Sequence, residues 1–379
     1  YEISLGLVGS EMCIRDSGSM GTMLQSAGLK AGELPELLNI SSPETVLAVH
    51  RGYAEAGSEY ITTNTFGANS LKFDNYAELI KTGVKLAKSV GKKVLLDIGP
   101  TGKLLKPMGD LDFDDAIEIF AQMIRAGKDG ADAVLIETMS DTYEIKAAVL
   151  AAKENCDLPI YVTMIFDEKG RLLTGADIKT AVTMLEGLGI DAIGFNCGLG
   201  PKQMLPFVEE IRRHTELPII LQPNAGLPES VNGQTVFNVT PKEFADDMEK
   251  AAHIGVSFLG GCCGTTPEHI RQMIERCREI PASVPEKKSF SRVSSYSETV
   301  DLGVKPIVIG ERINPTGKKL FKEALRRNDI DYIIKEGITQ RDAGAQVLDV
   351  NVGLPEIDEK AMMEQAVSSL QSVLSTPLQ

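Results

Sequence analysis

Three cysteines follow two short apolar segments of this sequence. Cys197 ends AIGFNC (192–197), and Cys262 and Cys263 end VSFLGGCC (256–263). If both segments are strands of one parallel sheet, their carboxyl ends lie on the same rim and the three thiols can converge there. Three thiolates suit Zn(II), and the glycines on both sides of the pair allow neighbouring side chains to turn the same way. The alternative is three ordinary buried cysteines without a ligand.

Cys197, Cys262 and Cys263 are therefore the predicted metal ligands and catalytic residues. A site with three protein ligands leaves a fourth position open to a substrate. Zinc bound by three thiolates is a mild Lewis acid, which deprotonates an incoming thiol and leaves it nucleophilic. We expect alkyl transfer to sulfur rather than hydrolysis, because the four histidines lie away from the strand ends. No two of them are four residues apart, which excludes a metalloprotease helix.

Polar residues also follow the other apolar segments. In a (β/α)8 barrel the carboxyl ends of the strands build the active site, so these residues are candidates. They are Thr62, Thr63, Asn64, Thr65, Asp97, Glu137, Thr138, Asn196, Gln222 and Asn224. Three of them have simpler interpretations: Asp97 accepts in a turn, Thr63 is a plain ladder residue and Glu137 is a solvated acid.

The elements that carry these residues follow one repeated unit. Near-continuous apolar runs, typical of strands buried on both faces, alternate with segments of helical spacing. The runs are 59–66, 94–100, 133–139, 159–166, 192–197, 218–226 and 256–264. An eighth strand is expected before Gly18, so residues 18–280 are predicted to form an α/β (β/α)8 TIM barrel with parallel strands. A doubly wound open sheet is the alternative, but no GxGxxG follows an early strand.

The sequence predicts four parts. Residues 1–17 read as a doubtful, non-native leader without the marks of a signal peptide. The barrel at 18–280 is followed by a Ser-, Pro- and charge-rich linker at 281–305. Residues 306–379 restart the strand–helix rhythm with PIVIGERIN and VLDVNVG, but two strands cannot close a barrel. We therefore expect a truncated second (β/α) barrel.

Composition narrows the function further. The chain has 379 residues and a net charge of −14, which argues against a nucleic-acid surface. Tryptophan is absent, which disfavours base stacking, and no apolar run is long enough to span a membrane. Six cysteines are too few for a secreted disulfide scaffold. We expect a cytoplasmic protein with neither nucleic acid nor membrane among its partners.

The order and spacing of seven motifs resemble the homocysteine S-methyltransferase barrel. The motifs are GSMGT, ITTNTFGAN, DIGPTG, LIETMSD, GFNCGLGP, QPNAGLP and GGCCGTTPEHI, and they cover about 18–280. The restart, VIGERINPTGKK and GAQVLDVNVGLP, is similar to the pterin-binding barrel of cobalamin-dependent methionine synthases. The chain thus resembles the N-terminal part of that multidomain family, whose cobalamin module would act in cis beyond the C-terminus or in trans.

The resemblance implies a role for each matching residue. Cys197, Cys262 and Cys263 correspond to the zinc ligands. The substrate-binding positions for homocysteine are Glu137, which meets the ammonium group, Thr63, which contacts the amino-acid end, and Asn224, with an orienting role. The folate cofactor pocket is matched by Glu311, Asn314, Asp349 and Asn351.

One position departs from the family pattern. The family's first strand usually ends in an acid directly before the glycine of this motif, whereas Ser17 stands there and Asp16 comes one residue earlier. A slip of one residue reverses the direction of a side chain in a strand. We therefore expect that Asp16 does not replace the missing acid.

The leading hypothesis is methyl transfer to the thiol of homocysteine, giving methionine. The implied methyl donor is methylcobalamin, recharged from 5-methyltetrahydrofolate at the second barrel. One alternative is a homocysteine methyltransferase that uses a small sulfonium or ammonium donor, which would not be expected to carry residues 306–379. Another is a non-catalytic zinc-binding barrel, which would bind zinc but not homocysteine.

Overall fold

The computed structural model describes residues 14–30, 32–231, 234–281 and 287–379. Contacts divide the chain into two compact units. The larger runs from the N-terminal side to Thr174 and continues over Leu185–Lys288, and the smaller joins Gly175–Met184 to Ser289–Gln379. Among the described helices, none combines the length and apolar character that a membrane crossing demands.

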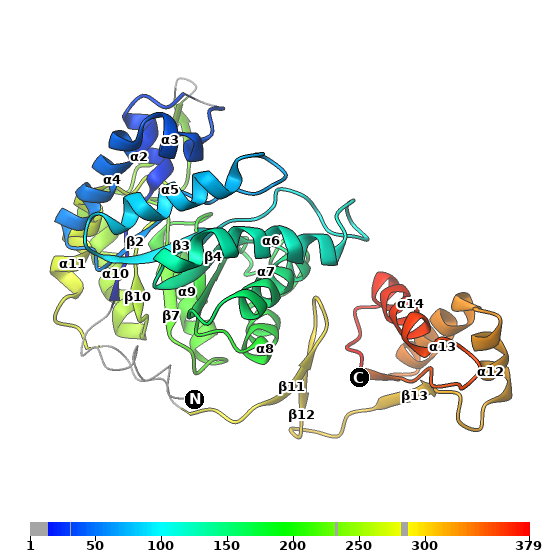
Figure 1. The fold of residues 1–379 in the computed structure, drawn as a ribbon. Helices are drawn as coiled ribbons and strands as arrows, with labels where there is room; N and C mark the ends of the chain where they lie inside the picture. The colour runs from blue at the N-terminus through cyan, green and yellow to red at the C-terminus, as the bar shows by residue number, and fades with distance from the viewer. Residues whose placement is uncertain (1–13, 31, 232–233, 282–286) are drawn as a thin grey trace. The chain divides into compact units, whose positions relative to one another are not determined.

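The larger unit is built on a parallel sheet of eight strands (Figure 1). Hydrogen-bonded neighbours follow the order β1-β10-β7-β6-β5-β4-β3-β2. The strands are β1 (Ile14–Arg15), β2 (Tyr60–Thr62), β3 (Lys93–Ile98), β4 (Ala133–Met139), β5 (Ile160–Met164), β6 (Ala192–Asn196), β7 (Ile219–Gln222) and β10 (Phe258–Leu259). All seven predicted strands are present, and β1 is the expected eighth strand before Gly18. It falls inside the predicted leader, of which residues 1–13 lie outside the described residues.

Helices alternate with these strands, as parallel pairing requires. They are α2 (Met20–Ser26), α3 (Leu38–Ser41), α4 (Pro43–Ala56), α5 (Tyr76–Lys88), α6 (Phe113–Gly127), α7 (Thr142–Asn155), α8 (Ile178–Leu188), α9 (Pro201–Arg212), α10 (Pro241–Ile254) and α11 (Pro267–Cys277). Short 3-10 turns, η1 (Pro35–Leu37) and η2 (Lys128–Gly130), join the set. Their ends follow local chemistry: Thr240 and Glu243 form a capping box at α10, and Gly255 closes that helix in the left-handed region.

An apolar layer fills the inside of the curled sheet. Buried side chains from seven strands form it: Tyr60, Leu95, Ala133, Leu135, Tyr161, Ala192, Ile220 and Phe258. The rings of Tyr161 and Phe258 lie 5.0 Å apart. Because side chains alternate along a strand, the next inward positions come two residues later. Five of these positions are polar and two are glycine, and the candidate site lies there: Thr62, Asp97, Glu137, Thr163 and Gln222, with Gly194 and Gly260.

The two end strands of the sheet meet through side chains. The hydroxyl of Ser58 donates to the carbonyl of Asp16, and the backbone N–H of Thr62 donates to the hydroxyl of Ser17. The parallel sheet and its alternating helices confirm the predicted α/β class. No backbone ladder joins β1 to β2 within the described ranges, so a closed (β/α)8 barrel stays a prediction.

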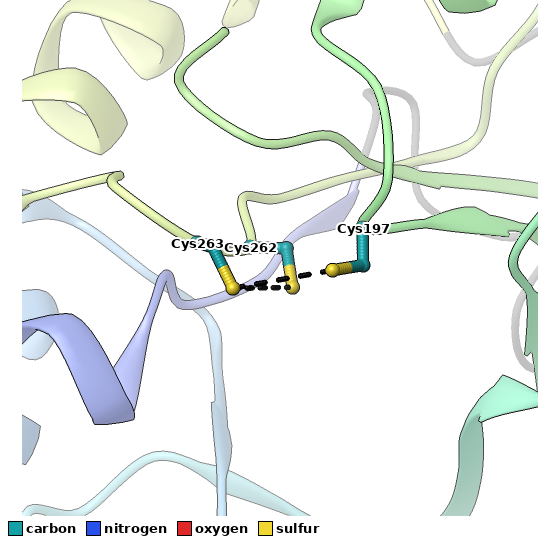
Figure 2. A group of neighbouring side chains, drawn as sticks. All are labelled: Cys197, Cys262 and Cys263. Atoms are coloured by element: carbon teal, nitrogen blue, oxygen red, sulfur yellow. Dashed lines mark hydrogen bonds between the residues drawn. The ribbon is translucent and has the colours of Figure 1, made fainter. Parts of the chain in front are cut away.

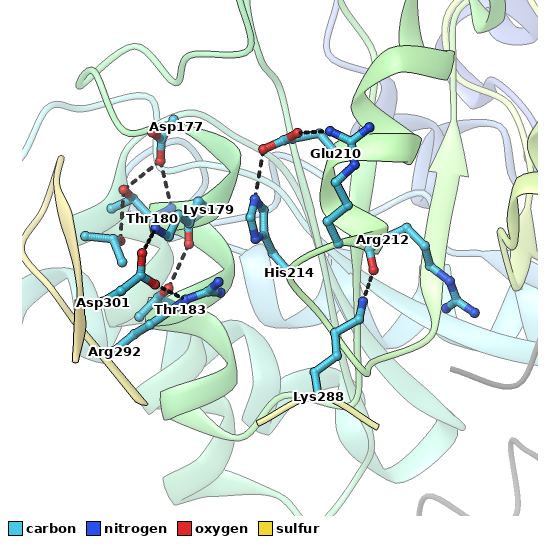
Figure 3. A network of polar contacts seen from close by, with 12 residues as sticks. Asp177, Lys179, Thr180, Thr183, Glu210, Arg212, His214, Lys288, Arg292 and Asp301 are labelled. Carbon is cyan, nitrogen blue, oxygen red and sulfur yellow. Dashed lines mark hydrogen bonds and ion pairs between the residues drawn. The ribbon is translucent and has the colours of Figure 1, made fainter. Parts of the chain in front are cut away.

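The predicted linker at 281–305 contains a hairpin, which the sequence analysis did not predict. β11 (Ser291–Ser294) and β12 (Thr299–Leu302) pair antiparallel. Asp301 bridges Lys179 on α8, at 2.5 Å, and Arg292, at 2.8 Å (Figure 3). The Ser-rich composition concealed two four-residue strands whose valines occupy paired positions. A second small hairpin, β8 (Glu229–Val231) with β9 (Gln234–Val236), follows β7 and was not predicted.

The smaller unit confirms the predicted restart of strands and helices. β13 (Ile309–Ile313) pairs parallel with β14 (Val347–Val350), and Leu348 forms a parallel bridge to Leu378. The helices are α12 (Lys319–Arg326), α13 (Ile330–Asp342) and α14 (Glu359–Val373). They pack around buried residues such as Phe321 and Leu370. The truncated second barrel itself stays a prediction.

Gly194 tests the packing of β6 against β7. An added Cβ there would lie 1.8 Å from the carbonyl oxygen of Ile220, a rigid backbone atom, whereas at Gly187 in α8 it would meet nothing within 4 Å. We expect Gly194→Ala to lower the free energy of unfolding by roughly 3 kcal/mol or more. The control Gly187→Ala should raise it by about 0.5–1 kcal/mol. Urea denaturation measures both, and equal effects would contradict this packing.

Candidate functional site

The three predicted cysteines do converge (Figure 2). The Sγ atom of Cys263 lies 3.9 Å from that of Cys197 and 4.0 Å from that of Cys262, and all three sulfurs are within 4.8 Å of one another. Sulfurs on a tetrahedral zinc with bonds of about 2.3 Å would be about 3.8 Å apart. The donor set and its spacing therefore fit a zinc ion with three protein ligands.

Two unusual backbone positions aim these thiols. Cys197 follows β6 with a φ of 57°, and its N–H donates to the carbonyl of Gln222 on β7. Cys262 and Cys263 open a four-residue turn that the N–H of Thr265 closes onto the Cys262 carbonyl. Gly264 is the third residue of this turn, with a φ of 81°, as a type II turn requires. The turn lets two consecutive thiols face one centre, which an extended strand forbids.

The thiols share charge through hydrogen bonds. Contacts from Cys262 and Cys263 lower the pKa of Cys197 to about 3. The same contacts with Cys197 raise the pKa of Cys262 and bring that of Cys263 to about 12. These shifts favour a single thiolate, on Cys197, over three. A bound divalent cation would supply the charge that permits three thiolates.

Asp16 belongs to the polar layer above the apolar one, contrary to expectation. β1 pairs Ile14 with Phe258, whose side chain faces inward, so the position two residues later returns to the inner face. The Asp16 carboxylate accepts a hydrogen bond from Gln222 Nε2, at 2.6 Å, and from the Thr62 hydroxyl, at 3.3 Å. Burial raises its pKa to about 6. The register of β1, invisible in the sequence, places this acid.

Glu137 and Asp97 form a pair of acids in the same layer as Asp16. Burial, then the charges of Asp16 and Cys197, raise the pKa of Glu137 to about 8. Burial and the adjoining Glu137 raise the pKa of Asp97, and a hydrogen bond links the two carboxyl groups. Both carboxyl groups therefore favour their protonated forms. The side-chain amide of Asn196 also donates to Glu137 Oε2, at 3.4 Å.

Other buried polar atoms around these acids are available to a ligand. Thr163 Oγ1, Gln222 Oε1 and Asn224 Oδ1 have no hydrogen-bond partner within the described part of the chain. Buried polar atoms normally have a partner, so their grouping with three acids indicates a binding pocket. A side-chain hydrogen bond also joins Asn224 to Cys197. The predicted residues Asn224 and Glu137 therefore lie with the sulfur cluster.

Thr63, which was predicted to contact the amino-acid end of the substrate, points away from these polar groups. Its hydroxyl accepts from the N–H of Asp97, at 3.0 Å, and lies 2.6 Å from that of Thr65. The neighbour Thr62 takes the inward position, since it comes two residues after the inward-facing Tyr60. The same alternation from Leu95 places Asp97 inward. Both residues were among the strand-end candidates, and period-two counting along each strand could have selected them from that set.

The four predicted pterin-binding residues lie at β13 and β14 of the smaller unit. Glu311 pairs with Lys318 at 3.0 Å. The Asn314 and Asn351 side chains accept from backbone N–H groups two residues later, and Asp349 is half-buried on β14. The backbone N–H of Asn351 donates to the carbonyl of Ile313, so the ends of the two strands adjoin. The edge is assembled, while its role in binding is a proposal.

Comparisons with known proteins agree with this geometry. The family model described as Homocysteine S-methyltransferase matches residues 16–277. Proteins named methionine synthase from Mycobacterium leprae and Mycobacterium tuberculosis are 31% and 32% identical over 95% and 100% of this chain. The chain spans about a third of their length, 33% and 34%.

A solved structure shares the fold of the larger unit. The homocysteine methyltransferase MmuM from Escherichia coli, in its metallated form, superposes with a TM-score of 0.62 at 21% identity. The match covers 73% of this chain and 100% of that one. The oxidized form of the same enzyme gives a TM-score of 0.61 at 20% identity, over 72% of this chain and 99% of that one.

The raised pKa of Glu137 predicts how stability depends on pH. Between its ordinary pKa of 4.5 and about 8, the folded protein keeps a proton that the unfolded chain has lost. The free energy of unfolding therefore falls as pH rises through this window, and Glu137→Gln removes that contribution. We expect the melting temperature of this variant, relative to the unsubstituted protein, to rise from about pH 5 to about pH 8.

Thermal unfolding of the metal-free proteins across this pH range provides the measurement. Glu154→Gln, at an exposed position of α7, is the matched control and should follow the unsubstituted protein at each pH. A pH-independent difference for Glu137→Gln would show that the buried carboxyl is not protonated.

Proposed function

Because the chain belongs to the homocysteine S-methyltransferase family and is therefore a methyltransferase enzyme, we propose that it methylates the thiol of homocysteine on a zinc site. The observation that carries the proposal is the convergence of Cys197, Cys262 and Cys263, with sulfurs within 4.8 Å of one another. They would hold the ion as thiolates and leave its fourth position to the substrate sulfur. When bound, zinc would acidify that thiol and keep it nucleophilic.

The polar layer supplies the groups that hold the amino-acid end. Asp16 and Glu137 carry the negative charge that a substrate ammonium group requires, and the ammonium charge would favour their ionised forms. Glu137, whose pKa is raised to about 8, would then release its proton to solvent. Asn224, which contacts Cys197, is proposed to orient the substrate beside the sulfurs. Thr63 acts indirectly, since its hydroxyl fixes the backbone of Asp97.

We propose methylcobalamin, recharged from 5-methyltetrahydrofolate, as the methyl donor. Support comes from the two relatives named methionine synthase, which match along nearly all of this chain, including the smaller unit. Glu311, Asn314, Asp349 and Asn351 would line the folate pocket of that unit. A cobalamin-binding module, in cis or in trans, would bring the methyl group to the larger unit. We also propose a cytoplasmic location, and four parts of the chain: a leader at 1–17, the zinc barrel at 18–280, a linker at 281–305 and the start of a pterin-binding domain at 306–379.

Zinc content tests the metal site. We expect about one zinc per chain in the purified protein and near-complete loss in Cys262→Ala, because two remaining thiolates bind zinc weakly. Cys156→Ala is the matched control, since this half-buried thiol lies at the end of α7 outside the cluster. Atomic absorption measures the metal. Unchanged zinc in Cys262→Ala would reject the assignment.

Proton release tests the action on the substrate. Adding homocysteine to the zinc form should release about one proton per bound thiol near neutral pH, since zinc binds the thiolate. The control ligand is 2-aminobutyrate, which has the amino-acid end without a sulfur, and its signal gives the contribution of Asp16, Asp97 and Glu137. Dye titration in weak buffer measures both. Equal release by the two ligands would contradict thiol activation.

A further inference from the structure

The turn that carries Cys262 and Cys263 is braced from behind by two hydroxyl groups. Thr265 is fully buried, and its Oγ1 donates to the carbonyl of Cys262 at 2.7 Å. The same oxygen accepts the N–H of Ser19 at 3.1 Å. Thr265 therefore ties the cysteine turn to the segment after β1 through one atom, in addition to the backbone bond that closes the turn.

Tyr53 on α4 holds this brace in place. Its side chain is 1% exposed, and its hydroxyl lies 3.0 Å from the carbonyl of Thr265 and 3.1 Å from that of Ser19. Both partners are backbone carbonyl oxygens, which only accept, so the single phenol hydrogen is shared between them. The hydroxyl thus lies between the two segments that Thr265 joins, and helix α4 fixes their separation.

The packing around the two side chains leaves no room for adjustment. A Cβ at Gly18 would lie 2.7 Å from Thr265 Oγ1 and 2.8 Å from the Tyr53 ring, and one at Gly261 would lie 2.6 Å from Thr265. Glycine at both positions lets the brace approach the backbone closely. The direction of the Thr265 hydroxyl is therefore set by its surroundings.

The turn has further anchors on its other sides. The N–H of Cys262 donates to the carbonyl of Pro223, and the carbonyl of Cys263 accepts from Ala225. These bonds come from the segment after β7, while the brace acts from the side of α4 and β1. Because the turn is fixed from opposite sides, the backbone of the two cysteines cannot shift away from Cys197 without breaking a buried hydrogen bond.

We propose that Thr265 and Tyr53 are positioning residues that set the geometry of the three-sulfur metal site. Neither is one of the three predicted ligands: Thr265 acts through the backbone of Cys262, and Tyr53 acts through the backbone of Thr265 and Ser19. The proposal rests on the zinc site proposed above. Hydrogen-bond partners of metal-binding residues typically change metal affinity about 10- to 100-fold when they are removed. A histidine ligand is held through its second ring nitrogen, which a cysteine lacks. Here the hydrogen bonds to the backbone of the cysteine turn provide the corresponding support.

The test compares substitutions that differ only in a hydroxyl group. Thr265→Val keeps the volume and removes the hydroxyl, whereas Thr265→Ser keeps the hydroxyl. We expect the zinc dissociation constant, from chelator competition, to rise about tenfold or more in Thr265→Val and to stay near the original value in Thr265→Ser. With Co²⁺ in place of zinc, Thr265→Val should also lose thiolate-to-cobalt charge-transfer absorption, which reports the sulfur geometry.

Thr215→Val separates positioning from stability. Thr215 is also fully buried and also uses its hydroxyl, toward Glu186, but it precedes β7 at the amino end of the sheet. The Thr215→Val variant should have a lower melting temperature, but its zinc affinity and its Co²⁺ spectrum should be unchanged. If Thr265→Val does not fold, Tyr53→Phe, which removes only the outer hydroxyl, is measured in the same way and should weaken zinc in the same direction.

The outcomes distinguish this proposal from the proposed function. The positioning role would be overturned if Thr265→Val, or Tyr53→Phe in its place, had the same zinc affinity and Co²⁺ spectrum as the unsubstituted chain. The zinc site itself would stand in that case. An unsubstituted chain that binds neither ion would overturn both.

Discussion

Three sulfur atoms about 4 Å apart cannot all be negatively charged unless a cation lies among them, and this constraint governs the larger unit. In its absence one thiolate, Cys197, accepts hydrogen bonds from two thiols. With a divalent cation the three can ionise together. The sheet order meets this demand because β6, β7 and β10 are neighbours, so the segments after them share one rim.

The second constraint is a change in the side chains that face the inside of the curled sheet. They are apolar at one inward position of a strand and polar at the next inward position, two residues later. Tyr60, Leu95 and Ile220 fill the interior, and two residues further along the same strands stand Thr62, Asp97 and Gln222. The apolar layer excludes water from below, which raises the pKa values of the acids above it. The three thiols and the buried acids then occupy one rim, which is the arrangement that the proposed substrate, with a thiol and an ammonium group, would require.

The start of the smaller unit also has a defined structure. Its hairpin is held to helix α8 by Asp301, which pairs with both Lys179 and Arg292. Partly buried ion pairs of this kind contribute little each, but they specify where a short hairpin docks. The smaller unit keeps its own core, with parallel β13 and β14 covered by three helices.

The sequence by itself determined the alternation of strands and helices, because apolar runs and helical spacing are local patterns, and it identified the three cysteines, because their segments end as strands should. It also named Glu137 and Asn224. The tertiary structure alone decided two things: the inward direction of Asp16, and the brace of Tyr53 and Thr265. Each depends on strand register or on contacts between residues far apart in the chain. Such contacts are set by how β1, β10 and α4 pack, and no local pattern encodes that packing.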